Sequence, residues 1–351
     1  MMLFDPNKKI SYKDGIYGLP FKKQDCKLVY IPVPWDVTTS YKSGTHKGPE
    51  AILKASEQID FFDLDYKDPY LAGLHMLPVP SKIKTMNKTV RLKAEKIIAA
   101  DEAKIQKSAV LKKTLAEVDK ASSFVNDWVY QNAKELLKNN QIPVVVGGDH
   151  STPFGAIKAY AEHFEDFGIL HIDAHSDTRV AYIGFEHSHA SIMYNSMEKF
   201  KGVQKLVQVG IRDFCEDEFL YTKNHSKIEV YFDATLSRRK NSGESFKKIA
   251  EEIVSKLPQN VYLSFDIDGL EPRFCPNTGT PVPGGIDYAE FLLLIETLIS
   301  SGKKLVGFDL VEVAPSGKKD DEWDANVGMR LLYKLSAHCL YSHGHIKKHS
   351  K

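Results

Sequence analysis

Residues 142–151, IPVVVGGDHS, place five consecutive apolar residues directly before a turn that carries Asp149 and His150. A continuous apolar run without polar alternation is typical of a strand buried on both faces of a parallel sheet. The same pattern recurs along the chain, in runs that we expect to be strands: 27–34 (KLVYIPVP), 168–172 (GILHI), 205–209 (KLVQV), 228–232 (IEVYF), 261–265 (VYLSF) and 304–310 (KLVGFDL).

Helix-like stretches lie between these runs, at 152–164, 246–257, 288–299 and 324–335. The alternation of strands and helices predicts a doubly wound α/β domain. Residues 82–140 differ, because they are rich in Lys, Ala, Glu and Leu and contain no Gly or Pro. We expect two helices there, with a break near Lys107 and Ser108, forming a solvated, charged layer. The chain shows no internal repeat or low-complexity linker, so we expect one domain over 1–351, with a helical elaboration at about 82–140.

The composition excludes several classes of protein. Lys and Arg total 47 and Asp and Glu total 46, so the net charge of +1 gives no basis for a nucleic-acid or membrane partner. Four scattered cysteines without a CxxC pair exclude a disulfide framework and a cysteine-rich zinc site, and they favour a reducing compartment. No apolar run reaches the roughly 18 residues of a membrane helix, and the first residues, MMLFDP, are unlike a secretory signal. We therefore expect a cytoplasmic protein.

Three segments gather metal-ligating residue types, each at the end of an expected strand: GGDHS at 147–151, DAHSD at 173–177 and DID at 266–268. The carboxyl ends of parallel strands meet at the edge of the sheet where ligands bind. Residues two apart on an extended segment point the same way, so Asp173, His175 and Asp177 can face one crevice, as can Asp266 and Asp268.

With His150, these segments bring four carboxylates and two imidazoles to one place. Carboxylates crowded together without cations raise each other's pKa, and two divalent cations would cancel that charge. Mixed carboxylate and imidazole ligation suits Mn²⁺, Fe²⁺, Zn²⁺, Co²⁺ or Ni²⁺. Two such ions can share a water and lower its pKa toward neutral. The pattern therefore predicts a two-metal centre that supplies hydroxide near pH 7.

From about residue 27 to 335, the sequence resembles the ureohydrolase family of arginases and agmatinases, with the agmatinase-like branch the nearer. The resemblance is carried by GGDHS (147–151), DAHSD (173–177), GIRD (210–213), SFDIDGLEP (264–272), NTGTPVPGG (277–285) and GFDLVEVAP (307–315). It implies a three-layer αβα fold with a mostly parallel, roughly eight-stranded sheet, assembled into trimers or hexamers. It also implies hydrolysis of a guanidino compound to urea and an amine.

The resemblance further implies which residues act. Two metal ions, Mn²⁺ or alternatively Ni²⁺ or another transition metal, would be held by His150, Asp173, His175, Asp177, Asp266 and Asp268. Asp177 would also hydrogen-bond the attacking hydroxide. Glu312 would accept paired N–H donors from the guanidinium group. His189 would carry a proton to the leaving amine, with His187 as the alternative two residues earlier.

Two departures from the arginase pattern concern the substrate. Arg179 stands where arginases have the Asn that reads the substrate carboxylate, and Cys215 stands where they have an Asp near the substrate amine. Arg179 resembles a formimidoylglutamase pattern, whereas HSHAS at 187–191 and PWDVTTSYKSGTHKGPEAI at 34–52 resemble the agmatinase-like branch. In the latter segment Trp35 is a candidate substrate contact. We therefore expect agmatine to be hydrolysed to putrescine, with guanidine, guanidinobutyrate, arginine and formimidoylglutamate as alternatives.

Two other classes of protein fit less well. A metal phosphatase is disfavoured because no phosphate-cradling basic cluster follows the expected strands. A non-catalytic family member is disfavoured because all six metal-ligand types are present.

Overall fold

The computed structural model describes residues 4–319 and 321–350, and its centre is an eight-stranded sheet in which neighbouring strands are parallel. The strand order is β2-β1-β3-β8-β7-β4-β5-β6. The strands are β1 (Leu28–Pro32), β2 (Leu74–Met76), β3 (Ile142–Val146), β4 (Phe167–Ile172), β5 (Val203–Ile211), β6 (Ile228–Phe232), β7 (Asn260–Asp266) and β8 (Lys304–Val311). The expected parallel sheet is confirmed.

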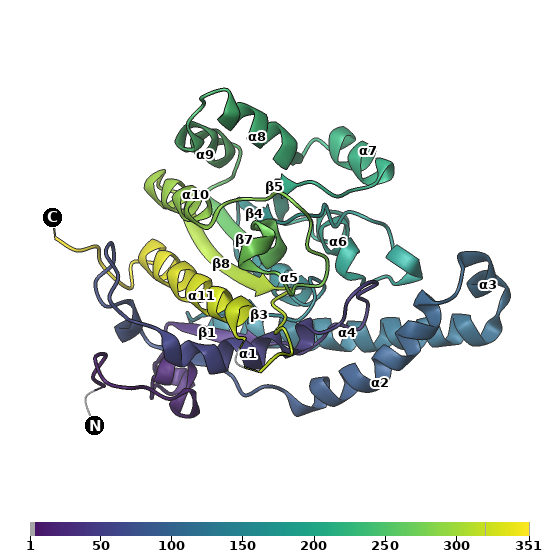
Figure 1. Ribbon diagram of the computed structural model, residues 1–351, viewed down its shortest axis with the longest axis horizontal. Helices are drawn as coiled ribbons and strands as arrows, with labels where there is room; N and C mark the ends of the chain where they lie inside the picture. The colour runs from purple at the N-terminus through teal and green to yellow at the C-terminus, as the bar shows by residue number, and fades with distance from the viewer. Residues whose placement is uncertain (1–3, 320, 351) are drawn as a thin grey trace.

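Helices cover both faces of the sheet, which gives three layers (Figure 1). One layer contains α1 (Gly48–Ala55), α9 (Phe246–Ser255), α10 (Tyr288–Ser300) and α11 (Trp323–Ser342). The other contains α2 (Ser81–Ile98), α4 (Ala109–Lys138), α5 (Phe154–His163) and α6 (Ile192–Lys199). The remaining α-helices of the described residues are α3 (Glu102–Lys107), α7 (Glu216–Asn224) and α8 (Asp233–Asn241).

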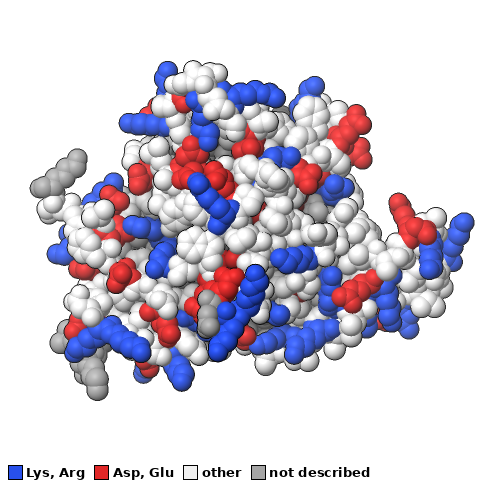
Figure 2. Space-filling view, in the orientation of Figure 1, with Lys and Arg blue, Asp and Glu red and all other residues white. Residues whose placement is uncertain are grey.

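This burial on two faces explains the continuous apolar runs in the sequence. Successive side chains of a strand point to opposite faces. Val144 and Val146 therefore pack in the core beneath α11, while Val145 packs in the core beneath α4, and all three are fully buried. Figure 2 shows acidic and basic side chains interspersed over the visible outer surface, as expected for a balanced charge.

The region expected to be helical at 82–140 contains three helices, α2, α3 and α4. The break near Ser108 lies where expected, because the Ser108 side chain accepts the Leu111 N–H and caps α4. A second break, at 99–101, was not expected; Asp101 caps α3 by accepting the Lys104 N–H. The junction of these helices projects beyond the sheet, at the right of Figure 1. Within the described ranges, no helix is both long and apolar enough to cross a membrane.

The middle of the sheet positions the site. β3, β8, β7 and β4 are consecutive neighbours, and the chain leaves all four at the same edge because they are parallel. A ligand crevice is expected where strand order reverses in such a sheet. The segments with metal-ligating residues follow three of these four strands.

Candidate metal centre and substrate pocket

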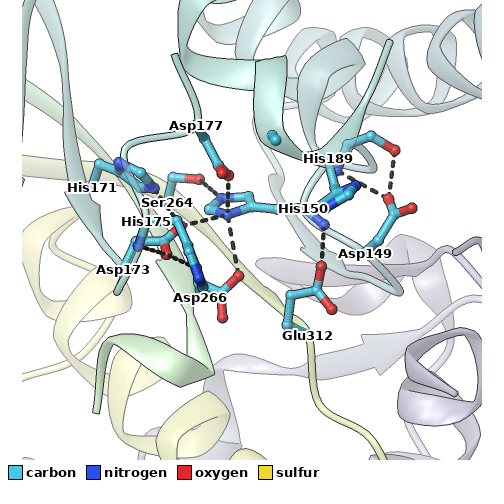
Figure 3. A network of polar contacts seen from close by, with 12 residues as sticks. Asp149, His150, His171, Asp173, His175, Asp177, His189, Ser264, Asp266 and Glu312 are labelled. Atoms are coloured by element: carbon cyan, nitrogen blue, oxygen red, sulfur yellow. Dashed lines mark hydrogen bonds and ion pairs between the residues drawn. The ribbon is translucent and has the colours of Figure 1, made fainter. Parts of the chain in front are cut away.

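The three segments converge as expected on one buried cluster of side chains (Figure 3). His150 follows β3, the stretch from Asp173 to Asp177 follows β4, and Asp266 ends β7 two residues before Asp268. Hydrogen bonds from backbone N–H groups to aspartate side chains fix these turns. Asp173 Oδ1 accepts the His175 N–H at 2.6 Å, and Asp266 Oδ1 accepts the Asp268 N–H at 2.8 Å.

His150 lies at the centre of a first group of acceptors. Its Nδ1 is 2.9 Å from Asp173 Oδ2, 3.1 Å from Asp177 Oδ2 and 3.3 Å from Asp266 Oδ2. Its Nε2 is 3.0 Å from Ser264 Oγ. One ring nitrogen carries at most one hydrogen, so His150 alone does not satisfy three carboxylates. A cation bound by these three carboxylate oxygens and by the lone pair of Nδ1 would satisfy all four atoms.

A second group shares Asp173 with the first. His175 Nδ1 is 3.3 Å from Asp173 Oδ1 and 3.3 Å from Asp268 Oδ2. Asp268 Oδ1 accepts the Ala174 N–H at 3.1 Å, which fixes its carboxylate. Each of the two groups offers at least three ligand atoms within 4.8 Å of one another. The arrangement is consistent with a binuclear metal site in which Asp173 belongs to both positions.

The electrostatics of this cluster also fit two divalent cations. Burial, reinforced by the neighbouring Asp173 carboxylate, raises the pKa of Asp177 to about 7. Burial and the charges of Asp268 and Asp173 raise the pKa of Asp266 well above its usual range. Carboxylates forced together in this way are ordinarily neutralised by protons or by metal ions. Mixed oxygen and imidazole donors of this kind suit Mn²⁺ and the other first-row transition metals.

His171 is a member of the first group that the sequence analysis did not single out. Its Nε2 is 2.8 Å from Asp173 Oδ2, and Gln208 Nε2 donates to its Nδ1 at 2.9 Å. That bond leaves Nε2–H as the donor to Asp173, so His171 holds this carboxylate in place. The spacing rule could have found it, because His171 lies two residues before Asp173; its position inside an apolar run concealed it.

Asp177 and Glu312 both have left-handed backbones, with φ of 53° and 61°. This conformation is unfavourable for residues with a Cβ, and here surrounding bonds impose it. The Asp177 carbonyl accepts the Met193 N–H at 3.0 Å. The Glu312 N–H donates to the Gly148 carbonyl at 2.8 Å, and the Glu312 carbonyl accepts the Thr278 hydroxyl at 2.8 Å.

Glu312 follows β8 and faces the cluster from the opposite side to Asp173 (Figure 3). Its Oε1 accepts the His150 N–H at 3.0 Å. Its Oε2 is buried and has no hydrogen-bond partner among the described residues. Burial, together with the charges of Asp266 and Asp149, raises the pKa of Glu312 well above its usual range. An unpaired buried carboxylate is costly, so this oxygen is suited to a cationic ligand.

A sequence model of the arginase family matches residues 26–337. The chain belongs to the arginase family. It is 31% identical to an N(1)-aminopropylagmatine ureohydrolase of Thermus thermophilus over 305 residues, which cover 86% of this chain and 87% of that one. It is 30% identical to the proclavaminate amidinohydrolase of Streptomyces clavuligerus, covering 88% of both chains.

Solved structures show the same fold. The proclavaminate amidinohydrolase of Streptomyces clavuligerus superposes with a TM-score of 0.71 at 24% identity, covering 97% of this chain and 100% of that chain. The agmatine ureohydrolase of Thermoplasma volcanium superposes with a TM-score of 0.69 at 23% identity, covering 96% and 97%. The chain is therefore a ureohydrolase-family enzyme whose buried His and Asp cluster is suited to metal binding.

A pocket of about 150 Å³ in this ureohydrolase opens onto the cluster. Four of the proposed metal ligands line it, as do Glu312, His189 and Arg179. Burial, with the nearby His175 and His150, lowers the pKa of His189 to about 3, so its imidazole is neutral. The backbone N–H of His189 donates to the Thr38 hydroxyl at 3.1 Å, which holds the backbone of this residue at the pocket wall.

Two other expected substrate contacts lie outside this pocket. His187 packs against Phe154 with the two rings tilted and their centroids 5.3 Å apart, and it lines a different cavity. Trp35 is 1% exposed and packs in the core beneath α4. Arg179 does line the catalytic pocket, so the structure separates His189 and Arg179 from His187 and Trp35.

Proposed function

We propose that this enzyme hydrolyses a guanidino compound with an aliphatic amine tail to urea and an amine, agmatine to putrescine being the simplest case. The observation that carries the proposal is the unpartnered Oε2 of Glu312, which is buried at the pocket wall. A guanidinium group presents paired N–H donors in a plane and satisfies a carboxylate of this kind. Relatives named agmatinase, at 27% identity, and N(1)-aminopropylagmatine ureohydrolase, at 31%, support the substrate class.

The proposed cofactor is a pair of Mn²⁺ ions, held by His150, Asp173, His175, Asp177, Asp266 and Asp268. When bound, such a pair lowers the pKa of water toward neutral and so provides a nucleophile. His171 would keep the Asp173 carboxylate oriented through its Nε2–H.

The chain's own residues carry the remaining steps. Glu312 would orient the guanidinium carbon toward the metal ligands. The Asp177 carboxylate would hold the proton released when water adds to that carbon. As the bond between this carbon and the alkyl-bearing nitrogen breaks, that nitrogen would take the proton held by Asp177. The neutral imidazole of His189 would relay a second proton to the amine from solvent, while the hydroxyl on the carbon gives its proton to solvent as urea forms. Urea and a protonated amine would then leave.

A second candidate has a specific observation in its favour. Among the described residues, Arg179 has one ionic partner, Glu218 Oε2 at 3.4 Å from Nε, and its terminal nitrogens have no hydrogen-bond partner. These nitrogens are suited to a substrate carboxylate, as in guanidinobutyrate or formimidoylglutamate. Guanidine and arginine complete the set of alternatives.

The test loads the protein with Mn²⁺ or Ni²⁺ separately and measures urea from agmatine, arginine, guanidinobutyrate and guanidine. Ammonia and formamide are measured for formimidoylglutamate. Urea from agmatine above the other substrates supports the first candidate, and product from an acid substrate alone replaces it with the second. The absence of product from every substrate with two metals bound per chain rejects both.

We also propose that residues 1–351 form one ureohydrolase domain that assembles into trimers or hexamers, as the family resemblance implies. The four cysteines are free thiols in the structure, which supports a reducing compartment such as the cytoplasm. Mass measurement in solution tests the assembly.

A further inference from the structure

The hydroxyl of Thr38 lies between a buried carboxylate and the ring of the proposed proton carrier. Thr38 Oγ1 is 3.4 Å from Asp149 Oδ2 and 3.4 Å from His189 Nδ1. The same oxygen accepts the backbone N–H of His189 at 3.1 Å. Thr38 and Asp149 are both 0% exposed, so the protein itself supplies the partners of this hydroxyl.

The carboxylate of Asp149 receives different donors at its two oxygens. Oδ1 accepts the Ser151 N–H at 3.0 Å and the Ser151 hydroxyl at 2.5 Å. Among the side chains of the described residues, Oδ2 has one donor, the Thr38 hydroxyl. A carboxylate only accepts, and a hydrogen bond to a charged acceptor is roughly twice as strong as a bond between neutral groups. The single hydrogen of the Thr38 hydroxyl is therefore given to Asp149 rather than to the ring.

The remaining hydrogen-bonding capacity of Thr38 determines the tautomer of His189. A hydroxyl oxygen has two lone pairs, and the backbone N–H of His189 occupies one of them. Nδ1 faces the other at 3.4 Å, and it satisfies that lone pair only if it carries the ring hydrogen. Ser188 Oγ also lies 3.4 Å from Nδ1 and can share this hydrogen. Nε2 then keeps its lone pair.

This tautomer decides which ring nitrogen transfers protons. Nδ1 already carries a hydrogen and contacts a buried hydroxyl, whereas the His189 side chain as a whole lines the catalytic pocket. Nε2 is therefore the nitrogen that takes a proton from solvent and gives it to the leaving amine. While both nitrogens are protonated, Nδ1–H still donates to Thr38, and the Asp149 carboxylate beyond it compensates the charge of the ring.

We propose that Thr38 is a positioning residue for His189: by bridging Asp149 and Nδ1, its hydroxyl fixes the tautomer in which Nδ1 carries the hydrogen and Nε2 is free for proton transfer. Asp149 acts on the ring through Thr38 and is a positioning residue as well. The role in turnover rests on the proposed function, in which His189 relays a proton to the amine, whereas the position of the hydrogen on the ring does not depend on that function.

Neutron diffraction from crystals of the Mn²⁺-loaded protein, grown in D₂O at neutral pH, locates the deuterium on the ring of His189. In the wild type we expect it on Nδ1. Asp149→Asn should move it to Nε2. The two donors of Ser151 keep the amide oxygen at the position of Oδ1, so the amide NH₂ group donates to Thr38. The Thr38 hydroxyl then donates to Nδ1. Deuterium on Nε2 in the wild type, or on the same nitrogen in both proteins, overturns the proposal.

Kinetics test the role in turnover. Thr38→Val removes the hydroxyl at nearly constant shape, and it should lower kcat about 10–100-fold, a part of the roughly 10²–10⁴-fold that a positioned general acid contributes. KM and metal content should change little. Thr38→Ser returns the hydroxyl and should restore most of the lost kcat. The matched control is Thr45→Val, because the Thr45 hydroxyl is buried in the same segment and has no hydrogen-bond partner among the described residues. Equal kcat in the two valine variants, or no recovery with serine, overturns the role.

The two measurements separate this proposal from the proposed function. If no guanidino compound yields urea, the proposed function fails, and the neutron map still decides which nitrogen carries the hydrogen. If urea is released and the wild type carries its deuterium on Nε2, the function stands and the bridge through Thr38 is rejected.

Discussion

The backbone N–H of His189 donates to the hydroxyl of Thr38 at 3.1 Å, across 151 positions of sequence. The loop that contains Thr38 is held in turn by helix α2. Arg91 Nη1 donates to the carbonyl oxygens of Val37 at 3.0 Å and Thr39 at 2.6 Å. The helical region therefore supports the proposed proton carrier through two successive contacts.

Replacing Arg91 by Ala should loosen this support. The carbonyls that it binds would lose their partners, at a cost of about 1–3 kcal/mol. We expect kcat to fall about 10-fold while metal content is retained. The control is Lys93→Ala on the same helix, which removes a partly exposed pair with Glu117. Equal kcat in both variants, measured as urea release under saturating substrate, would show that the loop needs no such support.

His189→Ala should lower turnover far more than metal content. A positioned general acid typically contributes about 10²–10⁴-fold to the rate, so we expect a loss in this range. His187→Ala is the matched control, because His187 lies against Phe154 in a different cavity and should change the rate little. Metal analysis and urea release on the same samples provide the readout. A parallel loss of metal and turnover contradicts a role in proton transfer.

Glu312→Gln should weaken the binding of the guanidinium group and misorient it. A charge-assisted bond contributes about 1.5–3 kcal/mol, which corresponds to roughly 10–150-fold in kcat/KM. Asp309→Asn is the control, because Asp309 is a buried carboxylate on β8, the strand that Glu312 follows. Its Oδ2 also lacks a partner among the described residues, and it does not line the pocket. If the two variants lose the same activity, the effect of Glu312 is structural.

Asp173→Asn and Asp268→Asn should differ in metal stoichiometry. Asp173 belongs to both ligand groups and Asp268 to one. After dialysis against limiting Mn²⁺, we expect the Asp173 variant to lose both metals and the Asp268 variant to retain about one per chain. Asp149→Asn, a buried carboxylate outside both groups, should retain two. Identical stoichiometry in the Asp173 and Asp268 variants would reject a shared ligand.

The stability of the fold should decline in mild acid because of His338. Burial lowers its pKa from 6.5 to about 4, and its Nδ1 lies 2.8 Å from the Tyr66 hydroxyl. As the pH falls below 6.5, the unfolded chain takes up this proton first, so stability present above pH 6.5 is lost down to about pH 4. The loss amounts to about 3 kcal/mol.

His338→Gln should make this decline shallower in urea unfolding curves recorded between pH 7 and about 4. His163→Gln replaces an exposed histidine at the end of α5 and should leave the pH dependence unchanged. Identical slopes for wild type and His338→Gln would assign the acid sensitivity to other groups.

Most strands could be predicted because burial on both faces leaves a strong local pattern. Ile142–Val146 and Ile228–Phe232 coincide with the expected runs. The edge strand β2 (Leu74–Met76) was missed because three residues are too short for a pattern, and its pairing with β1 is decided by the tertiary fold. The short helices α1, α6, α7 and α8 were also not expected. Helix α11 continues to Ser342, beyond the expected end at 335, because it packs along β8.

The metal cluster could be predicted because its residues occur in three short segments at strand ends. The contacts that hold the surrounding side chains in place could not be predicted. The bond from His189 to Thr38, the stacking of Arg179 on Tyr182 and the burial of Trp35 all depend on segments distant in sequence. Such contacts leave no periodic trace in one sequence, whereas the strand ends do.

The left-handed backbones of Asp177 and Glu312 have a consequence for the stability of this chain. Each costs a residue with a Cβ about 1–2 kcal/mol, which glycine would avoid. Exchange of either residue for glycine would remove this backbone cost together with the carboxylate. The chain thus gives up stability at two points of its backbone to hold carboxylates beside the proposed metal site.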